Sequence, residues 1–571
     1  MSSSDAGNKA FYWAAFFLQV LKQQGPEHII ISPGSRSTPL IMAAAASEDL
    51  CKHVVLDERS AAYMALGIGK STNNPPVLIC TSGTAVANYF PAVIEARSGG
   101  VPLLLLTADR PPHLHHSGAN QSIDQQKIYG QYPVFFHDVG EPSIDKKGLE
   151  SLQRLAAQSV HHAKSQGGPV HINFPFRKPL EPDKEYIESF KQDIQPFELK
   201  NKHAFSSGKE EEFSFQPHIS STVKNAENPL IVIGQLAAKT NLQPIFDLAR
   251  QLSAPVLSEQ GVIDSKFAIQ GFDGFLRNPV NRRNLKPDVI FRFGCQPASK
   301  SLLQALASWT PEAHIYLSDS GEWTDVENAT TDFIDWNGEC FDNIDCLNLS
   351  DRWLKKWKKT EQNYFERASK TFTNQETLTD GHIYHHIAPM IPESWTVFVS
   401  NSFPARDHSM FGQWRENKVF TNRGASGIDG ITSTAMGVNI GSGQAGILFT
   451  GDLAFLHDLN ALLNHKKLVS TLVIVVINNQ GGSIFRMLPI AEHQKYFNPY
   501  FETPQEVNIS RLAQSFEIHR KTINTIDQLE KFNLKDFVLK SEQNLHLIEC
   551  VTDPEASMRV RKNLWEASYE S

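Results

Sequence analysis

The stretch that decides the fold is LFTGDLAFLHDLNALLNHKKLVSTLVIVVINNQGGSIF, residues 448–485. A short apolar run ends in Gly451-Asp452, a helical pattern follows, and a second apolar run ends in Asn478-Asn479. Apolar runs of this length, bounded by Gly and Asn, are typical of buried parallel strands joined by a crossing helix. Ligands of such sheets lie beyond the carboxyl ends of the strands. We therefore expect a binding site where these two runs end.

The polar residues at those two ends favour a metal-bound diphosphate as the ligand. Asp452 and Asn479 offer a carboxylate and an amide oxygen, and a backbone carbonyl lies nearby. These are the hard oxygen donors that Mg²⁺ takes alongside phosphate oxygens. Glycines beside them let the backbone approach a ligand closely. Either end alone would be interpreted as an ordinary strand-end turn, but the pair with strand, helix and strand between them favours the site.

Composition limits the classes of protein that fit. A chain of 571 residues predicts about three or four domains. Its formal charge of −8 argues against general nucleic-acid affinity. No apolar run approaches the roughly 18 residues of a membrane span, and the N-terminus does not resemble a signal peptide. The 6 cysteines are scattered without a CxxC pair, which favours reduced thiols and a cytoplasmic location.

Alternating strand and helix patterns predict an α/β protein with three doubly wound parallel sheets. Strand patterns end in polar loops throughout the first and third domains, whereas a charged, aperiodic stretch suits a linker. An amphipathic pattern predicts a connecting helix between the second and third domains. The predicted segments are a first domain at 1–180, a linker at 181–225, a central domain at 226–350, the connecting helix at 351–375 and a third domain at 376–571.

Three segments resemble known binding motifs but lack a feature that each motif requires. Residues 441–446 match GxGxxG, but they follow a helix and precede a strand, the reverse of the order that dinucleotide binding requires. Gly69-Lys70-Ser71 is like the end of a P-loop, but Met64 stands where the first glycine should be. The histidines of residues 109–116 lack the spacing of metal ligands on a helix. A nucleotide-binding α/β protein is therefore a weak alternative.

The 448–485 stretch resembles the signature of thiamine-diphosphate enzymes, which begins with Gly-Asp-Gly and ends near Asn-Asn. The resemblance implies that Asp452, Asn479 and the carbonyl of Gly481 hold Mg²⁺ or Mn²⁺, and that Gly451 and Leu453 lie at the cofactor. Leu453 stands where the signature has glycine. Its side chain has no role in metal binding, so the assignment stands.

Thiamine chemistry also needs a carboxylic acid beside the aminopyrimidine ring of the cofactor. This acid favours the imino tautomer, which removes the thiazolium proton to give a carbanion, and a dry pocket would raise its pKa. Glu58, predicted at the end of an apolar strand in the first domain, has the right chemistry; by itself it would be a surface residue paired with Arg59. The resemblance further implies that Ile428 props the thiazolium ring and that Ser82 and Gly83 contact the cofactor.

Arginines in Gly/Ser-rich loops just past predicted strands indicate the substrate. Guanidinium groups recognise carboxylates with paired hydrogen bonds and a permanent charge. Several arginines facing one predicted cleft in an acidic chain point to a polycarboxylate rather than to pyruvate. The arginines are Arg36, Arg110, Arg406 and Arg423.

The match to one thiamine-diphosphate family is closer still. The motifs SPGSRSTPL (32–40), DER (57–59), TSGTAVANYFPAVIEA (81–96), LTADRPP (106–112), SGANQSI (117–123), GPVHINFPF (168–176), NRGASGIDG (422–430) and NNQGGSIF (478–485) resemble the 2-succinyl-5-enolpyruvyl-6-hydroxy-3-cyclohexene-1-carboxylate synthases of menaquinone biosynthesis. The resemblance implies decarboxylation of 2-oxoglutarate and addition of the resulting succinic-semialdehyde carbanion to isochorismate. Both substrates carry two carboxylates, which agrees with the arginines.

The same resemblance assigns further residues and an assembly. The four arginines, together with Gln121 and Ser402, match substrate-contacting positions, and Ile484 and Phe485 match an apolar wall beside the reacting carbon. Lys300 matches a basic position, but some members have Lys-Arg there and this chain has Lys300-Ser301. A homodimer or homotetramer with active sites between subunits is implied.

Two other readings remain open. One is a different 2-oxo-acid decarboxylase or carboligase, such as acetolactate synthase, and the other is a non-catalytic relative that binds or regulates a partner. A non-catalytic relative is expected to lose Glu58 or a metal ligand, and this sequence keeps all of them.

Overall fold

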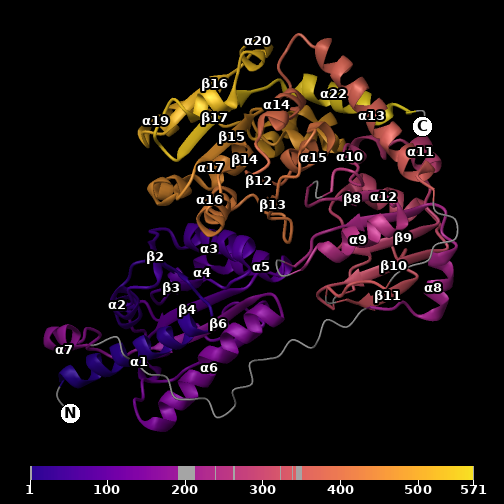
Figure 1. The fold of residues 1–571 in the computed structure, drawn as a ribbon. Coiled ribbons are helices and arrows are strands. Elements are labelled where there is room, and N and C mark those ends of the chain that lie inside the picture. Colours follow the sequence, from indigo (N-terminus) through magenta and orange to yellow (C-terminus); the bar gives the residue numbers. More distant parts are fainter. Residues whose placement is uncertain are drawn as a thin grey trace. The chain divides into compact units, whose positions relative to one another are not determined.

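The computed structural model describes residues 3–190, 213–237, 240–261, 264–321, 323–336, 338–342 and 350–569. Within these residues the chain forms three sheets in which neighbouring strands are parallel, with helices crossing between the strands (Figure 1). The predicted class, α/β with three doubly wound parallel sheets, is confirmed. The strands read as near-continuous apolar runs because both faces of each sheet are covered by helices.

The first sheet has the strand order β2-β1-β3-β4-β6-β5. Its strands are β1 (His28–Ile31), β2 (Cys51–Val54), β3 (Val77–Cys80), β4 (Leu103–Asp109), β5 (Phe135–Asp138) and β6 (Pro169–Pro175). One hydrophobic core joins the sheet to α1 (Ser3–Gln23), α2 (Thr38–Ala46) and α6 (Lys146–Ser165). The other helices here are α3 (Glu58–Thr72), α4 (Thr84–Asn88), α5 (Phe90–Ser98) and α7 (Lys184–Ser189).

The second sheet has the order β11-β10-β9-β7-β8. Its strands are β7 (Pro229–Ile233), β8 (Val256–Ser258), β9 (Val289–Phe293), β10 (Ala313–Ser318) and β11 (Asp332–Asp335). Its helices are α8 (Pro217–Lys224), α9 (Gln243–Leu252), α10 (Phe272–Phe275), α11 (Pro279–Asn284) and α12 (Lys300–Ser308). Helix α13 (Arg352–Thr373) occupies most of the predicted connecting segment, and it buries Trp353, Trp357 and Tyr364 along one face.

The third sheet has the order β13-β12-β14-β15-β17-β16. Its strands are β12 (Thr396–Val399), β13 (Val419–Thr421), β14 (Gly446–Gly451), β15 (Leu472–Asn478), β16 (His519–Ile523) and β17 (Leu545–Val551). The main helices are α14 (Asp380–Ile387), α15 (Phe403–Phe411), α16 (Ile431–Ser442), α17 (Asp452–His457), α19 (Ile509–Ser515) and α22 (Pro554–Glu566). β14 and β15 pair in parallel, and Gly451 lies opposite Ile477, so the two strands end side by side as predicted.

The chain divides into two compact units. Unit 1 comprises Met1–Ser207, Asp429–Gly443 and Asp458–Lys467, and unit 2 comprises Gly208–Ile428, Gln444–His457 and Leu468–Ser571. Helix α16 therefore belongs to unit 1, although strands of the third sheet lie on either side of it in the sequence. The second and third sheets share one hydrophobic core in unit 2.

Within unit 1, α16 packs closely against α3. A Cβ atom on Gly67 would lie 2.1 Å from the carbonyl oxygen of Thr434, and one on Gly437 would lie 2.0 Å from that of Met64. The two glycines therefore let the helix backbones touch. Tyr63 donates a hydrogen bond to Asp429 at the start of this contact. The helix that begins with Glu58 thus lies against the segment that follows Ile428.

Several details differ from the sequence-based expectations. Glu58 is not a strand-end residue: β2 ends at Val54, and Glu58 is the first residue of α3, because the Asp57 side chain accepts hydrogen bonds from the backbone of Arg59 and Ser60 and caps the helix. Arg406 lies in α15 rather than in a loop. Two short helices, α7 and α8, occupy part of the predicted linker, and its residues 191–212 lie outside the described chain.

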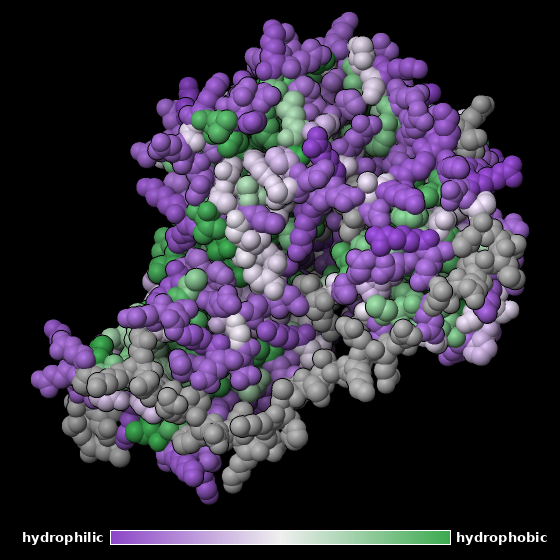
Figure 2. All heavy atoms as spheres, viewed as in Figure 1, coloured by the Kyte–Doolittle hydropathy of each residue, from purple (hydrophilic) through white to green (hydrophobic). Residues whose placement is uncertain are grey.

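Three properties of the described residues agree with the composition. On the face drawn in Figure 2, hydrophilic side chains predominate and hydrophobic ones form separate small patches. Among the described helices, none combines the length and apolar character that crossing a membrane requires. The five cysteines of the described residues are free thiols, and Cys346 lies outside them.

Candidate active site

The three residues predicted to hold a metal come together where β14 and β15 end. Asp452 directly follows β14, and Asn479 directly follows β15. The carboxylate of Asp452 accepts a hydrogen bond from the backbone N–H of Gly481. One carboxylate, one amide and one backbone carbonyl therefore surround the same sheet edge.

Burial prepares these groups for a cation. The Asp452 side chain is only 4% exposed, and this burial raises its pKa to about 7. A bound cation would favour the charged carboxylate and offset the desolvation. Asn479 is 6% exposed, and its Nδ2 atom donates to Asp380 at 3.1 Å. This bond turns the amide nitrogen toward Asp380, so the side-chain oxygen is the atom left for a metal.

The glycines of the motif have two different roles. Gly481 has φ +125°, and a Cβ atom there would lie 2.1 Å from the carbonyl oxygen of Glu502, so only glycine fits. A Cβ atom on Gly451 would have no heavy atom within 4 Å. Space therefore opens beside the carboxylate, at the place where a diphosphate would approach the backbone.

This donor set fits a metal-bound diphosphate. Among the described residues there is no cluster of three or more His, Cys, Asp or Glu that could hold a metal. The predicted site needs only one carboxylate, because an amide oxygen, a backbone carbonyl and phosphate oxygens complete a coordination sphere suited to Mg²⁺.

A buried ionic network supports this site, and no sequence motif predicted the network. Asp380 accepts hydrogen bonds from Asn479 and Thr552 and, at 2.6 Å, from Arg561. Arg561 also donates to Asp407. The Arg561, Asp380 and Asp407 side chains are almost completely buried, and the two carboxylates raise the pKa of Arg561. The network fixes the amide of Asn479 and also holds α15.

Two of the predicted substrate arginines meet in unit 2. Arg406 and Arg423 line one small cavity, which Glu259, Asp273 and His408 also line. Arg406 donates to the carbonyl oxygen of Ser402 at 2.8 Å. The Nε atom of Arg423 is buried and has no hydrogen-bond partner in the described part of the chain. A buried unpaired guanidinium nitrogen beside a second arginine is suited to an anionic ligand.

Residues near this cavity explain the sequence around Lys300. Ser299 and Ser301 turn inward, and both donate to Asp273. Lys300 lies between them as the first residue of α12 and is exposed. Ser301 is 1% exposed. The small serine side chain fits this buried position, whereas an arginine is much larger.

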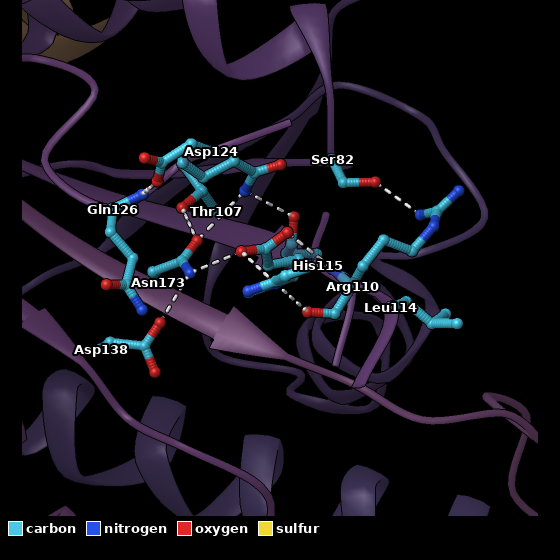
Figure 3. Close-up of polar contacts among 12 residues, drawn as sticks. Ser82, Thr107, Arg110, Leu114, His115, Asp124, Gln126, Asp138 and Asn173 are labelled. Atoms are coloured by element: carbon cyan, nitrogen blue, oxygen red, sulfur yellow. Dashed lines mark hydrogen bonds and ion pairs between the residues drawn. The ribbon is translucent and has the colours of Figure 1, made fainter. Parts of the chain in front are cut away.

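The other two arginines lie together in unit 1. Arg36 is buried and donates to the carbonyl oxygen of Phe176 at 2.7 Å. Burial lowers its pKa, and the nearby charge of Arg110 lowers it further. Arg110 donates to Ser82 Oγ at 2.5 Å (Figure 3). It also donates to the carbonyl oxygen of Asn120 at 3.0 Å. Gln121 is exposed, and its amide donates to the carbonyl oxygen of Ser82 at 2.8 Å.

The remaining predicted residues, except the buried Gly83, are at least partly exposed. Glu58 is half-buried at the start of α3, and Gly83 has φ +88° at the start of α4. Ile428 is 38% exposed, unlike an isoleucine that serves a core. Leu453, Ile484 and Phe485 are half-buried, and the ring of Phe485 packs edge-on against Phe501 at 5.9 Å. Their contacts with cofactor and substrate stay predictions.

Three protein-family profiles match successive parts of the chain. The thiamine pyrophosphate enzyme N-terminal TPP binding domain matches residues 13–128. The middle domain of thiamine pyrophosphate enzymes matches residues 189–399, and the C-terminal TPP binding domain matches residues 407–550.

Curated relatives match nearly the whole chain. A protein of Bacillus velezensis named 2-succinyl-5-enolpyruvyl-6-hydroxy-3-cyclohexene-1-carboxylate synthase is 34% identical, with 98% of each chain covered. A protein of the same name from Haloquadratum walsbyi is 35% identical, also with 98% of each chain covered. A third, from Rippkaea orientalis, is 35% identical over 96% of this chain and 95% of the relative.

Proposed function

This chain belongs to the thiamine-diphosphate-dependent enzymes and, within them, to the family of 2-succinyl-5-enolpyruvyl-6-hydroxy-3-cyclohexene-1-carboxylate synthases, and we propose that it catalyses the reaction in that family's name. It decarboxylates 2-oxoglutarate and transfers the remaining four-carbon unit to isochorismate, with release of CO₂. The observation that carries the proposal is the set of oxygen donors at the ends of β14 and β15.

The cofactor is thiamine diphosphate with Mg²⁺ or Mn²⁺, which when bound would supply a nucleophilic carbon for reaction with the 2-oxo group. Asp452, Asn479 and the carbonyl of Gly481 hold the metal, and Gly451 lets the diphosphate approach the backbone. Support comes from the buried carboxylate of Asp452 and from the open space at Gly451. Glu58 holds a proton at the aminopyrimidine nitrogen, while Ser82, Gly83, Ile428 and Leu453 contact the cofactor.

The substrates are bound through their carboxylates. Arg406 and Arg423 share one cavity in unit 2, and Arg36 and Arg110 lie close together in unit 1. Four fixed positive charges suit two dicarboxylates, whereas pyruvate carries a single carboxylate. Gln121 and Ser402 add polar contacts, Ile484 and Phe485 form an apolar wall, and Lys300 holds a further carboxylate.

The assembly is a homodimer or a pair of homodimers, in which Glu58 of one copy serves a cofactor held by Asp452 of another. This arrangement comes from the family resemblance. We keep the predicted domain boundaries and the cytoplasmic location as parts of the same proposal.

The test is turnover of the full-length protein with thiamine diphosphate and Mg²⁺. We expect CO₂ from 2-oxoglutarate, with sustained turnover only when isochorismate is added, and little CO₂ from pyruvate. Preference for pyruvate would favour an acetolactate-synthase-like enzyme. No CO₂ from either acid, despite bound cofactor, would favour a non-catalytic relative.

A further inference from the structure

Asn173 is a fully buried residue of β6 whose side-chain amide uses all of its hydrogen-bonding capacity. In the sheet it lies opposite Thr107 of β4 and Asp138 of β5. Its Nδ2 atom donates to Asp109 at 2.9 Å and to Asp138 at 2.8 Å. Its Oδ1 atom accepts from Thr107 Oγ1 at 2.9 Å and from Gln125 Nε2 at 3.1 Å. Two donors and two lone pairs are all that such an amide has.

Two of these partners continue to loops that carry predicted site residues. Asp109 Oδ1 accepts a hydrogen bond from the backbone N–H of Arg110 at 2.6 Å. Gln125 Oε1 accepts one from the backbone N–H of Gly83 at 2.9 Å, and its Nε2 atom also donates to the carbonyl oxygen of Ala108 at 3.2 Å. Asn173 is therefore hydrogen-bonded directly to the two side chains, Asp109 and Gln125, that hold these loops.

We propose that Asn173 is a positioning residue that fixes the loop after β3 at Gly83 and the loop after β4 at Arg110 in one arrangement. The loops also meet at their far side, where the Arg110 side chain donates to Ser82 (Figure 3). The amide of Asn173 clamps their near side. The importance of this arrangement for catalysis rests on the proposed function, in which Gly83 contacts the cofactor and Arg110 a substrate carboxylate.

The charges around Asn173 explain why an amide is needed here. Two carboxylates, Asp109 and Asp138, accept from the same nitrogen. His115 lies 3.6 Å from Asp109, and the charge of Arg36 also interacts with Asp109. His171, which shares Thr107 with Asn173, stays neutral, because burial lowers its pKa to about 3. A leucine would remove the donor that both acids share, and an aspartate would add a third negative charge.

Asn173→Asp therefore makes the loop positions depend on pH. At high pH three carboxylates face one another without a proton between them, which should force the loops apart. At lower pH one of them takes up a proton, and a carboxylic acid can donate one of the two missing hydrogen bonds. Burial already raises the pKa of Asp109, which favours this protonation. The defect should shrink as pH falls.

The first test is amide hydrogen exchange of the full-length protein without cofactor or substrate. In Asn173→Asp at pH 8, we expect protection of the Gly83 and Arg110 amides to fall at least tenfold relative to wild type at the same pH. At pH 6 the protection of both amides in Asn173→Asp should return to within about threefold of the wild-type value. Ile172→Val, a core change on the same strand, is the matched control and should show a ratio that is independent of pH. Unchanged protection in Asn173→Asp, or an equal loss at both pH values, would overturn the proposal.

A second variant tests one arm at a time and does not introduce a buried charge. Gln125→Ala removes the acceptor of the Gly83 amide and leaves Asp109 in contact with Asn173. Protection should fall at Gly83 and stay within about twofold of wild type at Arg110. If both amides respond equally, or neither does, the two-armed arrangement is wrong, whether or not Asn173→Asp folds.

Kinetics then separate this inference from the proposed function. With 2-oxoglutarate and isochorismate, Asn173→Asp should raise the KM for 2-oxoglutarate at least tenfold at pH 8 and much less at pH 6, with Ile172→Val within about twofold at both. If the KM of Asn173→Asp divided by the wild-type KM is the same at both pH values, the inference is contradicted. If the wild-type protein does not turn over these substrates but Asn173→Asp shows the expected loss of protection, the proposed function is refuted and the positioning role stands.

Discussion

Replacing Gly451 by alanine tests whether the space beside Asp452 is where the cofactor lies. Gly451 ends β14, and a Cβ atom there would have no heavy atom within 4 Å. The free protein should therefore accept the methyl group without strain. A Gly→Ala change at a compatible position stabilises by roughly 0.4–1 kcal/mol, because the unfolded chain loses freedom. We expect an unfolding midpoint equal to or slightly above that of wild type.

Binding should respond in the opposite direction. If the diphosphate fills this space, the methyl group must displace it, and one extra methyl in a packed site costs roughly 1–3 kcal/mol. At about 1.4 kcal/mol per tenfold, the affinity for thiamine diphosphate should fall about 5-fold to 150-fold.

Calorimetric titration with thiamine diphosphate at saturating Mg²⁺, paired with thermal unfolding of the cofactor-free protein, measures both effects. Gly481→Ala is the contrasting variant, because its Cβ would clash with Glu502 and so it should lose stability as well as affinity. Unchanged cofactor affinity in a stable Gly451→Ala protein would refute the placement of the diphosphate.

Three further predictions test the other groups. Glu58→Gln should abolish turnover and leave cofactor binding, measured by titration, largely intact; surviving activity would exclude Glu58 as the acid at the pyrimidine. Arg406→Ala should raise the KM for 2-oxoglutarate about tenfold or more, since a hydrogen bond to a charged group contributes about 1.5–3 kcal/mol, and an unaltered KM would remove Arg406 from the substrate site. Because burial raises the pKa of Asp452 to about 7 and a metal binds the deprotonated form, Mg²⁺ affinity should be level above pH 8 and decline by up to about tenfold per unit below pH 7; Asp452→Ala should weaken metal and cofactor together, and a flat wild-type profile would contradict the assignment.

Central strands are easier to recognise in this sequence than edge strands, for a physical reason. β4 and β15 are almost entirely buried and read as continuous apolar runs. β5 (FFHD) and β16 (HRKTI) are edge strands with partly exposed or charged residues. An edge strand pairs on one side only, so its residues carry little of the apolar pattern, and the neighbouring strand decides its structure.

The site shows the same division between local and distant information. Asp452 and Asn479 were predictable because each ends a strand of one parallel pair. The support of Asn479 was not, because it comes from Asp380, 99 positions away, and Asp380 is held in turn by Arg561, 181 positions further on. The helical position of Arg406 was missed for a local reason. Ser402, three residues after the end of β12, adopts φ +73° and is the N-cap of α15, where the polar sequence suggested a loop.

The central claim is that one metal-bound diphosphate joins the ends of β14 and β15. A crystal structure of the protein grown with thiamine diphosphate and Mg²⁺ tests it most directly. We expect the ion at about 2.0–2.1 Å from oxygens of Asp452, Asn479 and Gly481, with Glu58 of a neighbouring copy at the pyrimidine ring. An ion held by other residues, or a cofactor with no Glu58 from any copy beside its pyrimidine, would contradict the account.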